Sequence, residues 1–296
     1  MDNLRGALLM VAAMAAFAVE DLFIKLISSV MSSGQIISLL AAGGALIVMA
    51  ILRLRGARLW TDTYLHPLVL LRTALDVGAS LCFVTAITLI PLSTASAILQ
   101  AAPLVVTLGG ALFLGQAVGW RRWSAICIGF AGVLLIIRPG LEAFDPLSLL
   151  AVIGTIGLAG RDIATRALPT GMSGLHLSLH TFAAITPAGF LLMWATGHDW
   201  VTPDALNFAR LAICAVIGVG AYLLIVAATR IGDVAIVAPF RYSRLVFALV
   251  LAMIVLNERP DGIMLLGAAI VIASGIYTLV REARLRRTSP KAAKAV

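Results

Sequence analysis

Charged residues are scarce in this chain: Asp, Glu, Lys and Arg together make up only 12% of the 296 residues. Cysteine is rarer still, and three thiols within apolar runs argue against a disulfide framework. No His/Cys spacing suggests a metal, and neither Gly-x-Ser-x-Gly nor His-Glu-x-x-His occurs. We therefore expect no metal, no cofactor and no enzymatic activity. The shortage of charge also excludes a soluble globular domain.

Apolar residues dominate the composition instead. They make up 61% of the chain, and the mean hydropathy is +1.05. A membrane-spanning helix needs about 20 mostly apolar residues. Ten such runs lie at about 4–27, 34–53, 68–90, 93–114, 120–138, 147–167, 173–196, 206–229, 234–256 and 261–281. The sequence therefore predicts an all-α integral membrane protein with ten transmembrane helices.

The chain also repeats itself. Asp21 with Lys25 four residues later matches Asp162 with Arg166, and Gly132 matches Gly275. Because the segment with Asp162 and Arg166 is internal and cannot be a signal peptide, we interpret the matching first run as a span and not as a cleaved signal peptide. Five spans in each half make the second half cross the membrane upside down, which is the inverted-repeat plan of secondary transporters. The predicted parts are a first five-helix repeat at 1–141, a second, inverted repeat at 142–281 and a basic tail at 282–296.

Positive charge gathers on one predicted face. Most of the 22 Lys and Arg lie at the two termini and in the loops on the same side as the termini. The positive-inside rule therefore predicts cytoplasmic termini. The net charge of +8 then reflects membrane orientation. Without a basic, aromatic-interleaved soluble surface, a nucleic-acid partner is not expected. The expected partners are the lipid bilayer and a small-molecule substrate, for a monomer or a homodimer.

Some charges within the spans have an opposite charge one helical turn away. These pairs are Asp21/Lys25, Asp162/Arg166 and Arg72/Asp76. Residues four apart share one helix face, so we expect each pair to neutralise itself. The acids Asp21, Asp76 and Asp162 are also candidates for a proton or coupling-ion site, because intramembrane acids often serve such relays.

Four charges have no such local partner. They are Glu20, Arg161, Arg241 and Arg244. Arg244 is expected about 15 Å from the cytoplasmic end of its span, near the bilayer midplane. The four sum to +2, which favours a ligand with a carboxylate or another anionic group, since Arg binds carboxylates with two hydrogen bonds. Gln100, Tyr222 and Tyr242 lie at similar depths, and we expect them to line the substrate cavity. The alternative interpretation of each is an ordinary interhelical hydrogen bond.

Several motifs resemble a known family. They are Pro91–Ile98 followed by Pro103, then Leu112–Gln116 and Gly129–Val133, with second copies at Gly232–Ala235, Asn257–Pro260 and Gly275. Together they look like two EamA-type repeats of the drug/metabolite transporter superfamily, and the resemblance covers essentially the whole chain. It implies an exporter or exchanger of small metabolites, similar to the bacterial amino-acid exporters of the YddG kind. The repeat's usual terminal Glu is Glu258 in the second copy and Gln116 in the first, so we interpret both as helix-end structure.

The combined interpretation is an inner-membrane carrier that exports amino acids, particularly aromatic or other apolar ones, or close metabolites by alternating access. A zwitterion needs a cationic and an anionic contact around an apolar pocket. We expect Arg244 or Arg161 to bind the carboxylate and Glu20 the ammonium. Phe17, Tyr222 and Tyr242 would surround the side chain. The alternatives are an exchanger of anionic metabolites such as sugar phosphates or nucleotide sugars, a membrane scaffold and an intramembrane enzyme.

Overall fold

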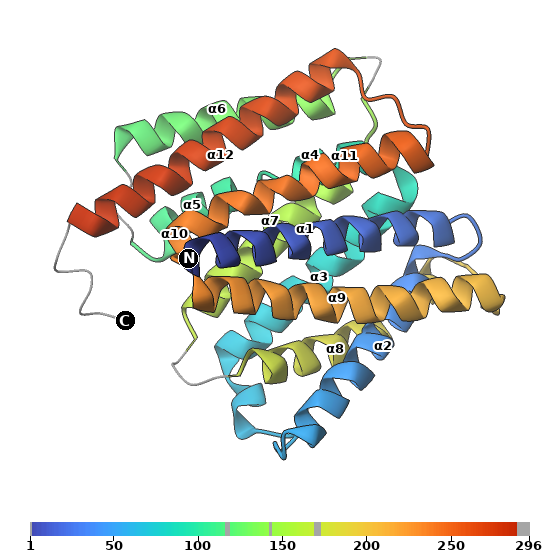
Figure 1. Cartoon of the computed structure of the whole chain (residues 1–296). Coiled ribbons are helices and arrows are strands. Elements are labelled where there is room, and N and C mark those ends of the chain that lie inside the picture. The colour runs from blue at the N-terminus through green and yellow to red at the C-terminus, as the bar shows by residue number, and fades with distance from the viewer. Residues whose placement is uncertain (1, 116–118, 142–143, 169–172, 289–296) are drawn as a thin grey trace.

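The protein is a bundle of long helices in a computed structural model (Figure 1), which describes residues 2–115, 119–141, 144–168 and 173–288. The first half contains α1 (Asp2–Ile27), α2 (Ser33–Leu54), the short η1 (Asp62–Leu65), α3 (Pro67–Leu89), α4 (Leu92–Leu99), α5 (Ala102–Phe113) and α6 (Trp120–Ile137). The second half contains α7 (Ser148–Arg166), α8 (Gly174–Ala195), α9 (Ala205–Ile231), α10 (Val234–Val237), η2 (Ala238–Tyr242), α11 (Ser243–Val255) and α12 (Gly262–Thr288). Within the described residues ten segments are long and apolar enough to span a membrane, which confirms the predicted fold class.

Two of the ten spans are interrupted. The fourth consists of α4 and α5, which meet at Gln100, and the ninth consists of η2 and α11, directly after the short α10. Pro103 and Pro239 lie directly after the break or within it. A proline lacks the backbone N–H and clashes with the preceding turn, so it ends a helix or starts a new one. Pro187 has no such effect, because α8 continues through it.

The helix pairs repeat under exchange of the two halves. Helix α1 packs along α9, and α7 packs along α3, which is the same pair with the halves exchanged. The pairs α2–α8 and α6–α12 each map onto themselves. The interrupted fourth and ninth spans also pack against each other, through α4 and α11. This pattern is that of a two-fold axis between the halves. With five spans in each half, the two halves cross the membrane in opposite directions.

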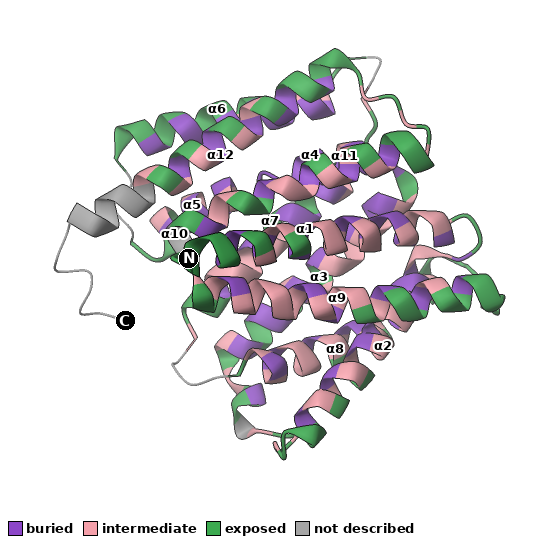
Figure 2. Cartoon of the chain, in the orientation of Figure 1, coloured by how far each residue is buried: buried purple, intermediate pink, exposed green. Residues whose placement is uncertain are grey.

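Small residues let the paired helices approach closely. A Cβ atom added to Gly34 would lie 2.6 Å from the Gly189 carbonyl oxygen, and one added to Gly132 would lie 2.8 Å from the Gly267 carbonyl oxygen. Such contacts between helix backbones are typical of membrane bundles. The outward face of the bundle carries large apolar side chains. Leu134 on α6, for example, is 57% exposed, and Figure 2 shows a band of exposed residues along that helix.

The two ends of the bundle differ in charge. Helix α1 begins, and α12 ends, at one end (Figure 1), which we call the basic end because Arg53, Arg166 and Arg230 lie in the last turns of helices that finish there. The other end of the bundle is called the opposite end. The predicted basic tail at 282–296 begins within α12, which continues to Thr288, and its residues 289–296 lie outside the described residues.

We propose that the basic end faces the cytoplasm. In a variant without native cysteines, single cysteines at Ser32, Leu141 and Thr202 should react with an impermeant maleimide added outside intact cells. A cysteine at Gly56 should react only after lysis. Labelling of the Gly56 cysteine in intact cells would reverse the proposed orientation.

Candidate functional site

An ion pair joins the two halves deep in the bundle. Arg244, at the start of α11, donates from Nη2 to both carboxylate oxygens of Asp21 on α1, at 2.9 and 2.7 Å. Its Nε donates to Asp21 Oδ2 at 3.1 Å. The Asp21 carboxylate is 5% exposed, and the guanidinium carbon of Arg244 lies 5.0 Å from the centre of the Phe17 ring. This geometry is a two-pronged grip on a carboxylate, with an aromatic ring against the cation.

The expected pair of Asp21 with Lys25 is therefore wrong. Lys25 Nζ donates instead to the carbonyl oxygens of Thr88 and Ile90, at 3.2 and 2.8 Å. These carbonyls close the end of α3, where a cation is favoured by the helix dipole. Arg244 has no opposite charge three or four residues away, and contacts along its own helix are the only ones that the sequence shows. Its partner comes from a neighbouring helix.

A second ionic cluster joins α3 to α7. Arg161 donates from Nη1 to Asp76 at 3.1 Å and from Nη2 to Asp162 at 2.8 Å. Arg72 Nη1 lies 3.6 Å from Asp76, which confirms that predicted pair. The ion-pair partner of Asp162 is Arg161 and not Arg166, so the expected Asp162/Arg166 pair is wrong. Arg161, which has no opposite charge three or four residues away, pairs with Asp76 and Asp162.

Threonines extend this cluster in a way that the sequence did not reveal. Arg72 donates to the hydroxyls of Thr165 on α7 and Thr181 on α8, at 3.1 and 2.7 Å. Thr73 shares a hydrogen bond of 2.9 Å with His180 Nδ1. These residues come from three helices, so no spacing along the chain could have connected them.

Two of the four charges singled out from the sequence remain without an ion pair among the described residues. Glu20 lies on α1 beside Asp21, and its carboxylate faces Gly218 on α9, where an added Cβ would lie 2.6 Å from Oε1. Arg241 lies exposed in η2. The expected surplus of +2 is therefore not present, because the two guanidiniums that produced it, Arg161 and Arg244, are paired.

The polar side chains divide between two places. Gln100 Nε2 donates to the Tyr242 carbonyl at 3.3 Å, which joins the breaks of the two interrupted spans. The Tyr242 hydroxyl is buried, packs against Gly275 and has no hydrogen-bond partner in the described part of the chain. Tyr222, in contrast, directs its hydroxyl to Gly174 at the start of α8. Of the predicted site, the structure therefore groups Phe17, Glu20, Asp21 and Arg244, and separately Arg161, Asp76 and Asp162.

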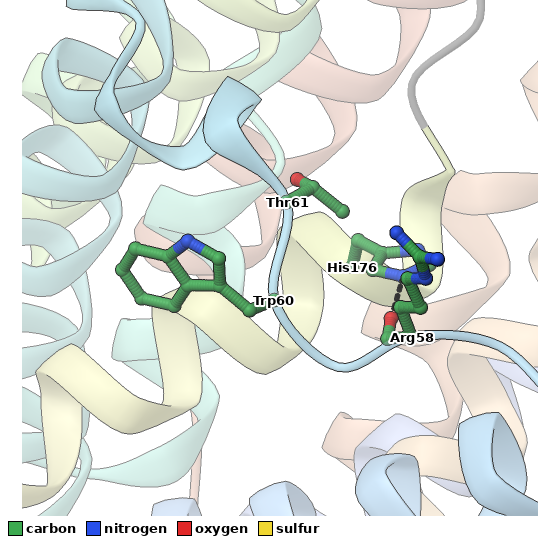
Figure 3. Close-up of a pocket in the computed structure, with 4 residues that line it drawn as sticks. All are labelled: Arg58, Trp60, Thr61 and His176. Atoms are coloured by element: carbon green, nitrogen blue, oxygen red, sulfur yellow. Dashed lines mark hydrogen bonds between the residues drawn. The ribbon is translucent and has the colours of Figure 1, made fainter.

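Two cavities open at the ends of the bundle, away from both ionic clusters. At the basic end a cavity of about 520 Å³ is lined by Arg58, Trp60, Thr61 and His176 (Figure 3), where His176 Nε2 lies 2.8 Å from the Arg58 carbonyl oxygen. At the opposite end a cavity of about 410 Å³ lies beside Glu258 and the ion pair between Arg138 and Asp261. The hydrogen bond from Arg138 holds the pKa of the Asp261 carboxyl below its usual value, so this pair is charged at neutral pH.

A bundle of ten spans with duplicated halves, interrupted helices and buried charge between the halves defines the class of membrane transporters. Comparison with known families supports this directly: the chain belongs to the EamA-like transporter family, which matches residues 4–138 and again 146–280. This is a family of transporters and not of enzymes.

Characterised relatives carry different substrates. The pseudopaline exporter CntI of Pseudomonas aeruginosa is 27% identical over 287 residues, or 96% of each chain. The riboflavin transporter of Vibrio cholerae is 28% identical over 288 residues, again 96% of each. The S-adenosylmethionine uptake transporter of Rickettsia bellii is 30% identical over 192 residues, and the chain spans 65% of that relative's length. A solved crystal structure shares the fold, with a TM-score of 0.62 at 17% identity over 93% of this chain and 98% of that one.

Proposed function

We propose that this protein is an inner-membrane carrier that exports amino acids, or close metabolites with an amino-acid head group, by alternating access. The observation that carries the proposal is the bidentate pair between Arg244 and Asp21, which links the second half to the first. Arg244 already holds a carboxylate there. A substrate carboxylate has the same shape and charge, so it can take the place of Asp21 on the guanidinium.

The neighbours of Arg244 favour a zwitterion. When the substrate carboxylate binds Arg244, the Asp21 carboxylate is released beside Glu20, its neighbour on α1. A substrate ammonium satisfies them, whereas a second anion does not. Phe17 lies against the guanidinium and offers apolar surface to a side chain. We therefore infer that the substrate has an apolar or aromatic side chain.

The pairing of the arginines weakens the alternative of an anionic metabolite. That alternative depended on a surplus of positive charge, and the α3–α7 cluster contains two guanidiniums and two carboxylates. Two of the three named relatives transport molecules other than S-adenosylmethionine, so family membership alone leaves the substrate class open. S-adenosylmethionine itself carries an amino-acid head group, which supports a shared recognition element.

A substrate screen tests the proposal. Purified protein in liposomes loaded with each unlabelled amino acid should accumulate the matching labelled compound by counterflow, most strongly for apolar and aromatic amino acids. S-adenosylmethionine, riboflavin and a sugar phosphate belong in the same screen. Accumulation of the sugar phosphate alone would reject the proposal in favour of the anionic exchanger. Repeating the assay with a pH gradient tests for proton coupling, because a proton-coupled carrier responds to the gradient. Asp21, Asp76 and Asp162 are the candidate sites for the coupled proton.

A further inference from the structure

The connection between α3 and α4 is held from both sides by opposite charges. Lys25, in the last turn of α1, donates to the Thr88 and Ile90 carbonyl oxygens at the end of α3. Glu258, from the segment between α11 and α12, accepts hydrogen bonds from the Leu92 and Ser93 amides at the start of α4, at 2.7 and 2.9 Å. The cation meets the carbonyl end of one helix and the anion the amide end of the next, as the helix dipoles favour.

Helix α4 depends on Glu258 for this cap. Its own N-cap residue is Pro91, which forms no side-chain cap hydrogen bond. The first amides of a helix have no partner within the helix and must be satisfied from elsewhere. The backbone conformation of Asn257, with φ of 55°, lets the chain turn sharply after α11 before Glu258. Gly115 has a φ of 61° at the corresponding point of the first half, and Gln116, which follows it, lies outside the described residues.

The same region closes one end of the bundle. Every residue of α4 except Thr94 is buried, and α4 packs against α11 of the other half. Toward the basic end the two interrupted spans separate, because α5 packs against α7 whereas α10 and η2 pack against α1 and α12. The bundle is therefore closed at the opposite end between α4 and α11.

We infer that Glu258 and Lys25 are gating residues that hold the opposite end of the transporter closed. Opening this end moves α4 away from α11 and its following segment, so the Glu258 cap must break and two amides must lose their partner. Lys25 fixes the α3–α4 connection to α1 and thereby aims the two amides at Glu258. This inference rests on the proposed transport by alternating access and adds to it which contacts hold the closed state.

Accessibility of a buried reporter tests the gate without any substrate. Ser96 lies on α4 beneath the connection, is 1% exposed, and its hydroxyl has no hydrogen-bond partner among the residues that the structure describes. Ser96→Cys in a background without native cysteines is therefore a mild change. We expect Glu258→Ala to raise the rate at which an impermeant maleimide labels this cysteine from the opposite end by about tenfold or more, since two hydrogen bonds to a charged group are lost. Lys25→Met should raise it by a smaller factor.

Two further variants make the result decisive. Glu258→Gln keeps the side-chain shape and one amide partner, so it should give an intermediate rate and serves if the alanine variant does not fold. Arg259→Gln removes the adjacent exposed charge, which makes no hydrogen bond to the connection, and should label as slowly as the parent. Unchanged labelling in both Glu258 variants overturns the inference, and so does an equal rise with Arg259→Gln. Failure of the substrate screen leaves this result standing, because labelling requires only that the gate opens.

Discussion

Arg244→Lys should reduce transport about 10- to 100-fold while the protein remains folded. Lysine keeps the positive charge that Asp21 requires but loses the planar pair of donors that binds a carboxylate bidentately. Initial rates of counterflow in liposomes, at matched protein density, measure the effect. Gel filtration and thermal unfolding establish that the variant is folded. Arg230→Gln, an exposed change at the end of α9, is the control and should transport normally.

A double variant separates substrate binding from gate locking. Arg244→Ala alone leaves the Asp21 carboxylate buried and unpaired, which costs about 3–5 kcal/mol and confuses stability with function. Asp21→Asn with Arg244→Gln removes both charges at similar size, so stability should largely return while transport stays absent. If Arg244 only locks a closed state through its charge, Arg244→Lys retains near-normal flux. Normal transport by the double variant would reject any role of Arg244 in binding.

The ten spans and their duplication were predictable because each depends on information that lies along the chain. The length and apolar content of a run decide whether it spans the bilayer, and the match of Asp21 to Asp162 decides the repeat. The prediction that Glu258 has a helix-end role also agrees with the structure, although it caps α4 from the other half of the protein. Nothing along the chain indicates which helix end Glu258 caps.

The partners of the buried charges could not be predicted in the same way. Spacing of four residues correctly paired Arg72 with Asp76, but it also paired Asp21 with Lys25, which lies one turn away. An arginine side chain reaches a neighbouring helix as easily as the next turn of its own. Which one it bonds depends on the packing of α1 against α11 and of α3 against α7, and that packing is set by close contacts such as Gly154 on Phe83.

The second large effect is expected at Asp76, and it concerns stability. The Asp76 carboxylate is 9% exposed and lies 3.1 Å from Arg161 and 3.6 Å from Arg72. Asp76→Ala would leave two guanidiniums without this shared counter-charge in the bundle, and breaking a buried pair costs about 3–5 kcal/mol. We expect a large fall in the midpoint of thermal unfolding in detergent. Asp162→Ala is the matched comparison, because its carboxylate is 33% exposed and the same Arg161 retains Asp76.

Asp76→Asn distinguishes this structural role from a coupling role. The amide keeps the size of the carboxylate and accepts one hydrogen bond from Arg161, so much of the stability lost in Asp76→Ala should return. If Asp76 only neutralises Arg72 and Arg161, transport by the folded Asp76→Asn protein keeps its response to a pH gradient. If Asp76 carries the coupled proton, that response disappears while exchange without a gradient persists. Equal unfolding midpoints for Asp76→Ala and Asp162→Ala would contradict the structural prediction, because burial would then have no bearing on the cost of removing a counter-charge.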